Sequence, residues 1–122
     1  MYDARYSGIL LAVSSLPGPY GIGSLGACAR RFVDFLSQAG QTYWQILPLV
    51  PLGHGNSPYM STSAFAGNPL LIDLDELASQ GLLTPQELDQ AKWITPDQVD
   101  YDHLNATRLP LLKRAFERYQ QL

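Results

Sequence analysis

The chain has 122 residues, 46% of them hydrophobic, and a formal net charge of -3. This length suits about one domain with a real core, and the lack of a basic stripe excludes nucleic acid and anionic membranes as expected partners. A single cysteine, Cys28, excludes an internal disulfide framework and predicts a soluble protein of the reducing cytoplasm. Its apolar helical surroundings favour a buried thiol over a nucleophile.

The first half of the sequence has the pattern of a strand, a helix and a second strand. Ser7–Val13 is a continuous apolar run, which predicts a strand buried on both faces, as in a parallel sheet. Residues 25–38 have the period of an amphipathic helix, and Gly40 is placed to end it. Thr42–Leu47 predicts the second strand. The three together predict a right-handed βαβ unit.

Residues 21–26 spell G-x-G-x-x-G between the first strand and the helix, which raises the possibility of a dinucleotide site. The glycines begin several residues after the strand, and two prolines intervene. Ile46 and Leu47 stand where a ribose-binding carboxylate is expected. A tight turn into a helix is therefore favoured, and no cofactor is expected.

Residues 53–69 form a long segment without strand or helix period, which predicts a binding loop. Tyr59 offers a flat apolar face of the kind that stacks on a sugar ring. Five uncharged polar residues suit a neutral, hydroxylated ligand: Asn56, Ser57, Ser61, Thr62 and Ser63. The alternative is that Tyr59 and Phe65 pin the loop to a core while the hydroxyls stabilise turns.

Two helix-start signals follow the loop. Asp73 is placed to cap a helix at 74–80, with Glu76 completing a capping box. Residues 84–87, Thr-Pro-Gln-Glu, give a second capping box with proline at the first helical position. Asp73 and Asp75 also suit a catalytic pair, but helix capping explains both more simply.

The last segment, 101–121, predicts a long helix with six apolar residues on one side: Leu104, Leu111, Leu112, Ala115, Phe116 and Tyr119. Pro110 either kinks this helix or marks its true first turn. Residues 95–98 predict a further helix start or a turn.

Four motifs in order resemble the start of the 4-α-glucanotransferases, the amylomaltase or disproportionating enzymes related to the α-amylases. These are Ser15–Gly23, Tyr43–Leu49, Asn56–Tyr59 and Ser63–Pro69. The resemblance is specific over residues 7–75 and looser over 76–122. It implies an α/β fold, the opening βαβ portion of a (β/α)8 barrel followed by a mostly helical insertion.

The implied domain division places the start of the catalytic barrel at 1–75 and the start of a family-specific helical subdomain at 76–122. The loop 48–69 follows the second strand, so it points at the catalytic cleft, which lies at the carboxyl ends of barrel strands.

The family transfers α-1,4-glucan segments between maltooligosaccharides by a retaining double displacement, which needs two carboxylates about 5 Å apart. The resemblance places these carboxylates on later barrel strands, so no catalytic residue, metal or cofactor is expected here. It implies substrate contacts at Tyr59 and Ser57, with Asn56 and Gly55 beside them. An outer glucan groove is implied at His54 and Tyr101, although His54 departs from the larger aromatic of related enzymes.

The expected partners are maltooligosaccharides or α-1,4-glucans and the remainder of the barrel in a longer chain. The alternative is a stand-alone glucan-binding module without catalysis. Two strands bury little sheet and leave an open edge, which favours truncation over an independent module.

Overall fold

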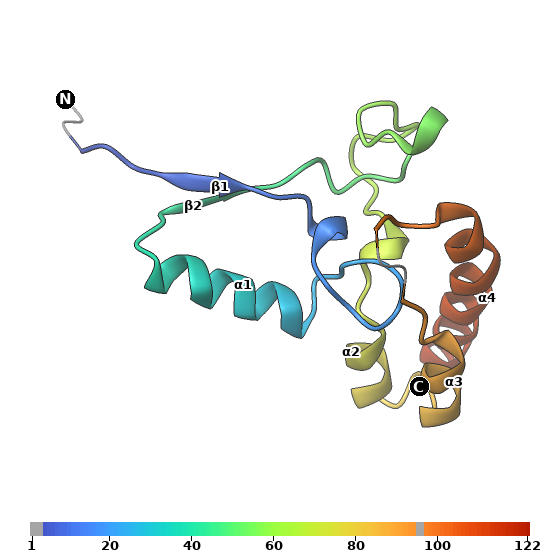
Figure 1. Cartoon of the computed structure of the whole chain (residues 1–122). Coiled ribbons are helices and arrows are strands. Elements are labelled where there is room, and N and C mark those ends of the chain that lie inside the picture. Colours follow the sequence, from blue (N-terminus) through green and yellow to red (C-terminus); the bar gives the residue numbers. More distant parts are fainter. Residues whose placement is uncertain (1–3, 95–96) are drawn as a thin grey trace.

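The computed structural model describes residues 4–94 and 97–122. The predicted turn or helix start at 95–98 therefore lies partly outside the described residues. Figure 1 shows a thin arm at the N-terminal end, formed by strands and a helix, that leads into a body of loops and helices. In chain order the elements are β1 (Gly8–Leu10), η1 (Val13–Ser15), α1 (Ala27–Gln38), β2 (Tyr43–Gln45), η2 (His54–Asn56), η3 (Pro69–Leu71), α2 (Leu74–Ser79), α3 (Pro85–Ala91) and α4 (Tyr101–Gln120), where η denotes a short 3₁₀ helix.

The predicted βαβ unit is confirmed. β1 and β2 pair in parallel, with Ile9 opposite Trp44 in the register, and α1 connects them. The Trp44 ring meets the Phe32 ring of α1 edge to face, with centroids 5.0 Å apart. Its indole N–H donates to the Leu11 carbonyl at 2.9 Å. The aromatic contact thus holds α1 against the sheet, and the hydrogen bond ties β2 to the end of β1.

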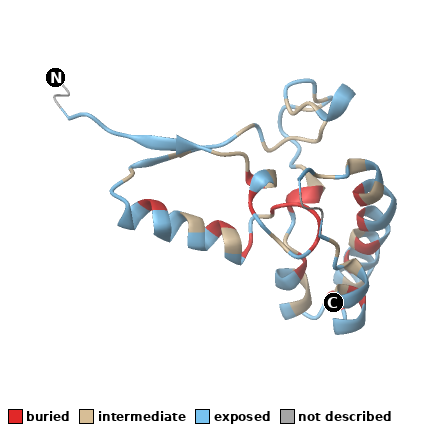
Figure 2. Ribbon diagram, viewed as in Figure 1, coloured by how far each residue is buried: buried red, intermediate tan, exposed pale blue. Residues whose placement is uncertain are grey.

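The prediction of a first strand buried on both faces is wrong. β1 covers three residues, all exposed, with Ile9 at 42% and Leu10 at 59% of full exposure. Figure 2 shows the arm mostly in the colour of exposed residues. In the described part of the chain this sheet has two strands, so apolar residues that suit the middle of a larger sheet lie in the open.

Local signals placed most helix ends correctly. α1 begins at Ala27, two residues after the predicted start, and ends at a turn where Gly40 has a left-handed φ of 72°. Asp73 caps α2 by accepting from the Glu76 N–H at 2.9 Å. Glu76 does not complete a capping box, since its carboxylate instead lies 3.6 Å from Arg30.

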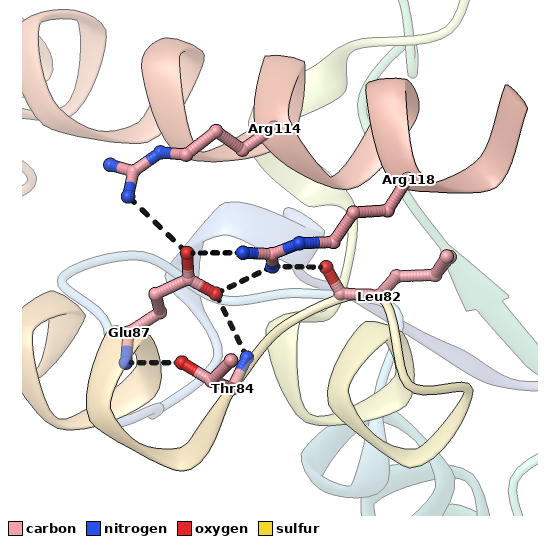
Figure 3. A network of polar contacts seen from close by, with 5 residues as sticks. All are labelled: Leu82, Thr84, Glu87, Arg114 and Arg118. Carbon is pink, nitrogen blue, oxygen red and sulfur yellow. Dashed lines mark hydrogen bonds and ion pairs between the residues drawn. The ribbon is translucent and has the colours of Figure 1, made fainter. Parts of the chain in front are cut away.

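The second capping box is confirmed and extends into a polar network (Figure 3). The Glu87 N–H donates to the Thr84 hydroxyl at 3.2 Å, and the Thr84 N–H donates to the Glu87 carboxylate at 2.8 Å. Arg118 of α4 donates twice to the same carboxylate, at 2.7 and 3.0 Å, and once to the Leu82 carbonyl. Arg114 adds a bond at 3.2 Å. One buried carboxylate therefore joins the start of α3 to the end of α4.

Two adjoining cores hold the body together. The first contains Val13, Leu16, Ile22, Ala29, Leu70, Leu71 and Leu104. The second contains Tyr20, Leu74, Leu82, Leu83, Leu111 and Ala115. α4 contributes to both cores and runs unbroken through Pro110, which is therefore not its first turn. The prediction that Phe116 and Tyr119 belong to the apolar side of α4 is wrong, because these residues are 56% and 63% exposed.

Arg108 connects the two cores from within. It is buried, and its guanidinium donates to the Tyr20 carbonyl at 2.7 Å and to the Leu70 carbonyl at 3.4 Å. Burial lowers the pKa of Arg108 from its ordinary value, and the negative charge of Asp73 acts in the opposite direction. Arg108 thereby attaches the loop after β1 and the short helix η3 to the middle of α4.

Candidate functional site

The predicted binding loop is closed at its base by hydrogen bonds. The Asn68 N–H donates to the Leu49 carbonyl at 2.8 Å, which joins the two ends of the loop. The Asn68 side chain then accepts from the Leu70 N–H at 3.0 Å and caps η3. Because η3 belongs to the first core, the loop projects from a fixed base. In Figure 1 it lies on the opposite side of the body from α2 and α3.

A tight turn at residues 53–57 shapes the near side of the loop. The Gly53 N–H donates to the Ser57 carbonyl at 2.9 Å. Gly55 and Asn56 both have left-handed backbone, with φ of 64° and 57°. Glycine adopts this conformation freely, and asparagine tolerates it better than most residues. A Cβ atom on Gly53 would stand 1.8 Å from the Met60 carbonyl oxygen, so glycine is required there.

We therefore expect Gly53→Ala to displace the loop, because the new methyl group meets fixed backbone. Proteolysis within residues 53–66 should become at least about 5-fold faster, since local opening exposes the chain to the enzyme. Gly67→Ala is the matched control, because a Cβ atom there has no heavy atom within 4 Å. Equal proteolysis of the two variants would contradict this reading of the turn.

A cavity of about 840 Å³ lies beside this turn. Its polar lining comes from three segments: Ser14 and Ser15 after β1, Asn56 in the loop, and Asp97, Gln98 and Tyr101 before and at the start of α4. Asn56 and Tyr101 also line two adjoining hollows, of about 480 and 140 Å³. The structure thus brings Gly55, Asn56 and Tyr101 to one concave surface, although 45 residues separate the last two in sequence.

The other predicted contact residues lie outside these hollows. Tyr59 is 73% exposed, and the half-buried Ser57 accepts the Tyr59 N–H on its hydroxyl at 3.2 Å. His54 is exposed and does not share a hollow with Tyr101. Phe65 is fully exposed, at 101%. The alternative in which Tyr59 and Phe65 pin the loop to a core is therefore wrong, because both rings face solvent.

Sequence reasoning missed several polar residues of the cavity. Ser14 and Ser15 line the cavity from η1, shortly after β1, and sequence reasoning gave them no contact role. Their position beyond the carboxyl end of a parallel strand was an available signal, because ligands bind at that edge of such sheets. Asp97 and Gln98 lie in an irregular segment, and no local pattern pointed to them.

The glycine-rich segment before α1 leaves no room for a nucleotide phosphate. The Ser24 hydroxyl donates to the Asp73 carboxylate at 2.7 Å. A Cβ atom on Gly26, the residue that caps the start of α1, would stand 2.1 Å from an Asp73 oxygen. A carboxylate thus already faces the helix end where a phosphate would bind. This arrangement supports the tight-turn interpretation over the dinucleotide one.

Asp73 and Asp75 are both occupied by structural partners. Asp73 caps α2 and accepts from Ser24, and Asp75 accepts from the buried Tyr20 hydroxyl at 2.5 Å. Burial is the larger cause and this hydrogen bond the second that raise the pKa of Tyr20 above its ordinary value. The two carboxylates therefore connect α2 to the segment between β1 and α1. Capping and packing account for them without a catalytic role.

Three further features of the described residues bear on the sequence analysis: the environment of Cys28, the length and polarity of the helices, and the distribution of metal-ligating side chains. Cys28 is partly exposed instead of buried, and its sulfur accepts from the Arg31 guanidinium at 2.8 Å. Across residues 4–94 and 97–122, no helix has the length and apolar character needed to cross a membrane. Within the same ranges, His, Cys, Asp and Glu side chains do not gather in threes as metal ligands.

Comparison with known proteins agrees with the motifs. A sequence profile of the family described as 4-alpha-glucanotransferase matches residues 11–122. The 4-alpha-glucanotransferase of Synechocystis sp. is 53% identical over 120 residues, which are 98% of this chain and 24% of the relative. That of Thermus thermophilus is 50% identical over 117 residues, 96% of this chain and 23% of the relative.

A solved structure gives the same result in three dimensions. The amylomaltase from Streptococcus agalactiae in complex with acarbose superimposes with a TM-score of 0.92 at 41% identity. The match covers 98% of this chain and 24% of that one. The chain thus spans about a quarter of the length of the relatives it matches. The profile covers most of the chain, and about half of the aligned residues are identical to those of the relatives. The chain therefore belongs to the 4-alpha-glucanotransferase family.

Proposed function

We propose that this chain supplies the amino-terminal substrate contacts of a 4-α-glucanotransferase, which transfers α-1,4-glucan segments between maltooligosaccharides by a retaining double displacement. The observation that carries the proposal is the loop closed by Asn68 and Leu49, which presents the Tyr59 ring, 73% exposed, three residues along the chain from Asn56 in the lining of a polar cavity. An open aromatic ring next to uncharged hydrogen-bonding groups suits the apolar face and the hydroxyls of a glucose unit.

The proposed contacts divide into an exposed group and a cavity group. Tyr59 and Ser57 belong to the exposed part of the loop, and Ser57 can still donate its hydroxyl proton because its oxygen accepts from the Tyr59 N–H. Gly55 and Asn56 line the cavity. Tyr101 lines the same cavity, and we propose it with the nearby loop residue His54 as an outer glucan contact.

The catalytic groups are proposed to lie on other parts of the barrel. Within the described residues Asp97 is the carboxylate that lines the cavity of about 840 Å³. Asp100 and Asp102 line the adjoining hollow, where Asp100 caps α4 by accepting from the His103 N–H at 3.0 Å. Double displacement needs a second carboxylate about 5 Å from the first, on the other side of the scissile bond. The division into a barrel start at 1–75 and a helical subdomain at 76–122 is part of the same proposal. A cytoplasmic location is also proposed, supported by the single cysteine.

The test is Tyr59→Ala, with maltoheptaose binding to the 122-residue chain measured by isothermal titration calorimetry. We expect affinity to fall about 5-fold, because stacking on an exposed aromatic ring contributes roughly 1 kcal/mol. Phe65→Ala is the matched control, since it removes an even more exposed ring from the same loop and should leave affinity unchanged. Unchanged affinity in Tyr59→Ala, or an equal loss in both variants, would count against the proposal.

A further inference from the structure

The arm, formed by residues 6–10, α1 and 43–46, exposes an unusual amount of apolar surface. At least half of each of these side chains is open to solvent: Tyr6, Leu10, Val33, Phe35 and Tyr43. Its sheet has two strands in the described chain, so the outer edges of β1 and β2 carry unpaired backbone groups. Parallel sheets occur almost only with both faces covered. The arm is therefore an incomplete layer.

The two faces of the small sheet differ. Trp44 and its register partner Ile9 lie on the face covered by α1, because Trp44 contacts Phe32 there. Side chains alternate along a strand, so Leu10 and Tyr43 lie on the opposite face. Tyr43 meets Tyr6 edge to face at 5.9 Å, and a hollow of about 470 Å³ borders these residues. This second face has no helix against it in the described chain and is the one that a barrel interior would fill.

The body has a buried core of its own. Its second core contains Leu74, which has no exposed surface, and Arg118 and Glu87 connect its helices. Figure 2 shows buried residues gathered in the central loops and on the inner side of α4. Exposed apolar side chains also lie on α4, such as Phe116 and Tyr119, but within the described residues the sheet of the arm is the part with two open edges and one uncovered face.

The comparisons identify what covers the arm. The chain superimposes on a quarter of the Streptococcus agalactiae amylomaltase with a TM-score of 0.92, so the arm has the arrangement found in a chain about four times as long. A second copy of this chain is a poorer occupant. Two-fold pairing of β1 with itself would be antiparallel and would involve a strand of three residues, with few hydrogen bonds.

We infer that the arm is a docking surface for a polypeptide that supplies the other β/α units of the barrel, and that it binds such a polypeptide even when the two are separate chains. One incoming strand pairs in parallel with β1 and another with β2. Their side chains cover Leu10 and Tyr43. This inference rests on the proposed function and deepens it, because the docked units would extend the surface around the glucan loop.

The experiment co-expresses the tagged 122-residue chain with the part of the Streptococcus agalactiae amylomaltase that follows the matched quarter. We expect a soluble complex with equal amounts of both chains, purified without any glucan. Tyr43→Asp should lower recovery of the larger fragment at least about 10-fold, because it buries a charge in an apolar contact. Tyr119→Asp is the matched control, since Tyr119 is 63% exposed against 59% for Tyr43 but lies on α4. Its recovery should equal that of the unmodified chain.

Circular dichroism of the three 122-residue chains checks that the substitutions leave their folding unchanged. The inference is overturned if the larger fragment stays insoluble with the unmodified chain, or if Tyr43→Asp captures it equally well. It is also overturned if the chain forms a dimer that Tyr43→Asp disrupts while no fragment is captured. Complex formation needs no glucan, so Tyr59→Ala should leave it intact. Failure of docking is therefore distinguishable from failure of the proposed glucan contact.

Discussion

Leu74→Ala is expected to lower the free energy of unfolding of the 122-residue chain by about 3 kcal/mol, the typical cost of emptying a buried leucine site. Leu74 is the fully buried large side chain of the described structure, at 0% exposure, and lies in the second core between α2 and α4. Its neighbours belong to separate elements that cannot all move inward to fill the space. Urea denaturation followed by circular dichroism gives the value.

Ile72→Ala is the control for this prediction. Ile72 precedes Leu74 by two residues and loses a similar number of carbon atoms, but it is 42% exposed. Removing a partly hydrated side chain should cost less than about 1 kcal/mol. Equal losses at the two positions would show that the second core does not hold the body together.

Glu87→Gln is expected to lower the free energy of unfolding by about 2 kcal/mol near neutral pH, because hydrogen bonds to a charged group are replaced by weaker neutral ones. Arg118 donates to both carboxylate oxygens, at 2.7 and 3.0 Å. These bonds and the Thr84 N–H lower the pKa of Glu87 from 4.5 to about 2, against the opposing effect of burial. The carboxylate therefore stays ionised in the folded chain.

The pH dependence of this effect follows from the direction of the shift. In the unfolded chain the pKa of Glu87 returns to its ordinary value of 4.5, so the folded state holds the proton less tightly. The contribution of the carboxylate is complete above this value and is lost as pH falls toward 2. Urea unfolding of both proteins at about pH 7 and about pH 3 should show the difference between them shrinking at the lower pH.

Glu76→Gln provides the comparison for Glu87. Glu76 lies 3.6 Å from Arg30, and the two side chains are 49% and 70% exposed. Solvent screens such a pair, so its loss should change stability by less than about 1 kcal/mol at either pH. A pH-independent deficit in Glu87→Gln would mean that its carboxylate is not held as the structure indicates.

The elements that the sequence predicted well depend on neighbours along the chain. Asp73, the pair of Thr84 and Glu87, and the turn at Gly40 act within four residues, so their patterns determine the local backbone. The parallel βαβ unit was also predicted, since one helix between two short apolar runs has few other ways to pack.

The errors arose where burial depends on distant parts of a protein. Ser7–Val13 has the composition of a central strand, but burial requires strands that the described chain does not contain. Phe116 and Tyr119 fit the helical period of α4 but lie beyond the surface that α2 and α3 cover.

The candidate site was predictable in part. The loop and its polar, aromatic composition were visible in the sequence, and Asn56 was among the residues identified. Its shared cavity with Tyr101 was not predictable from periodicity, because α4 reaches that position through Arg108 and the first core. The motif resemblance suggested Tyr101, but paired it with His54 and not with Asn56.

The hydrogen bond between Asn68 and Leu49 holds the two ends of the loop together. The number of residues between them can therefore change without moving these ends. Residues added or removed between these two change how far the loop extends, while β2 and η3 keep their places. The entropy of closing a loop grows only slowly with its length, so such changes cost the fold little. The position of the scaffold beneath the loop is therefore independent of how far the loop reaches into solvent.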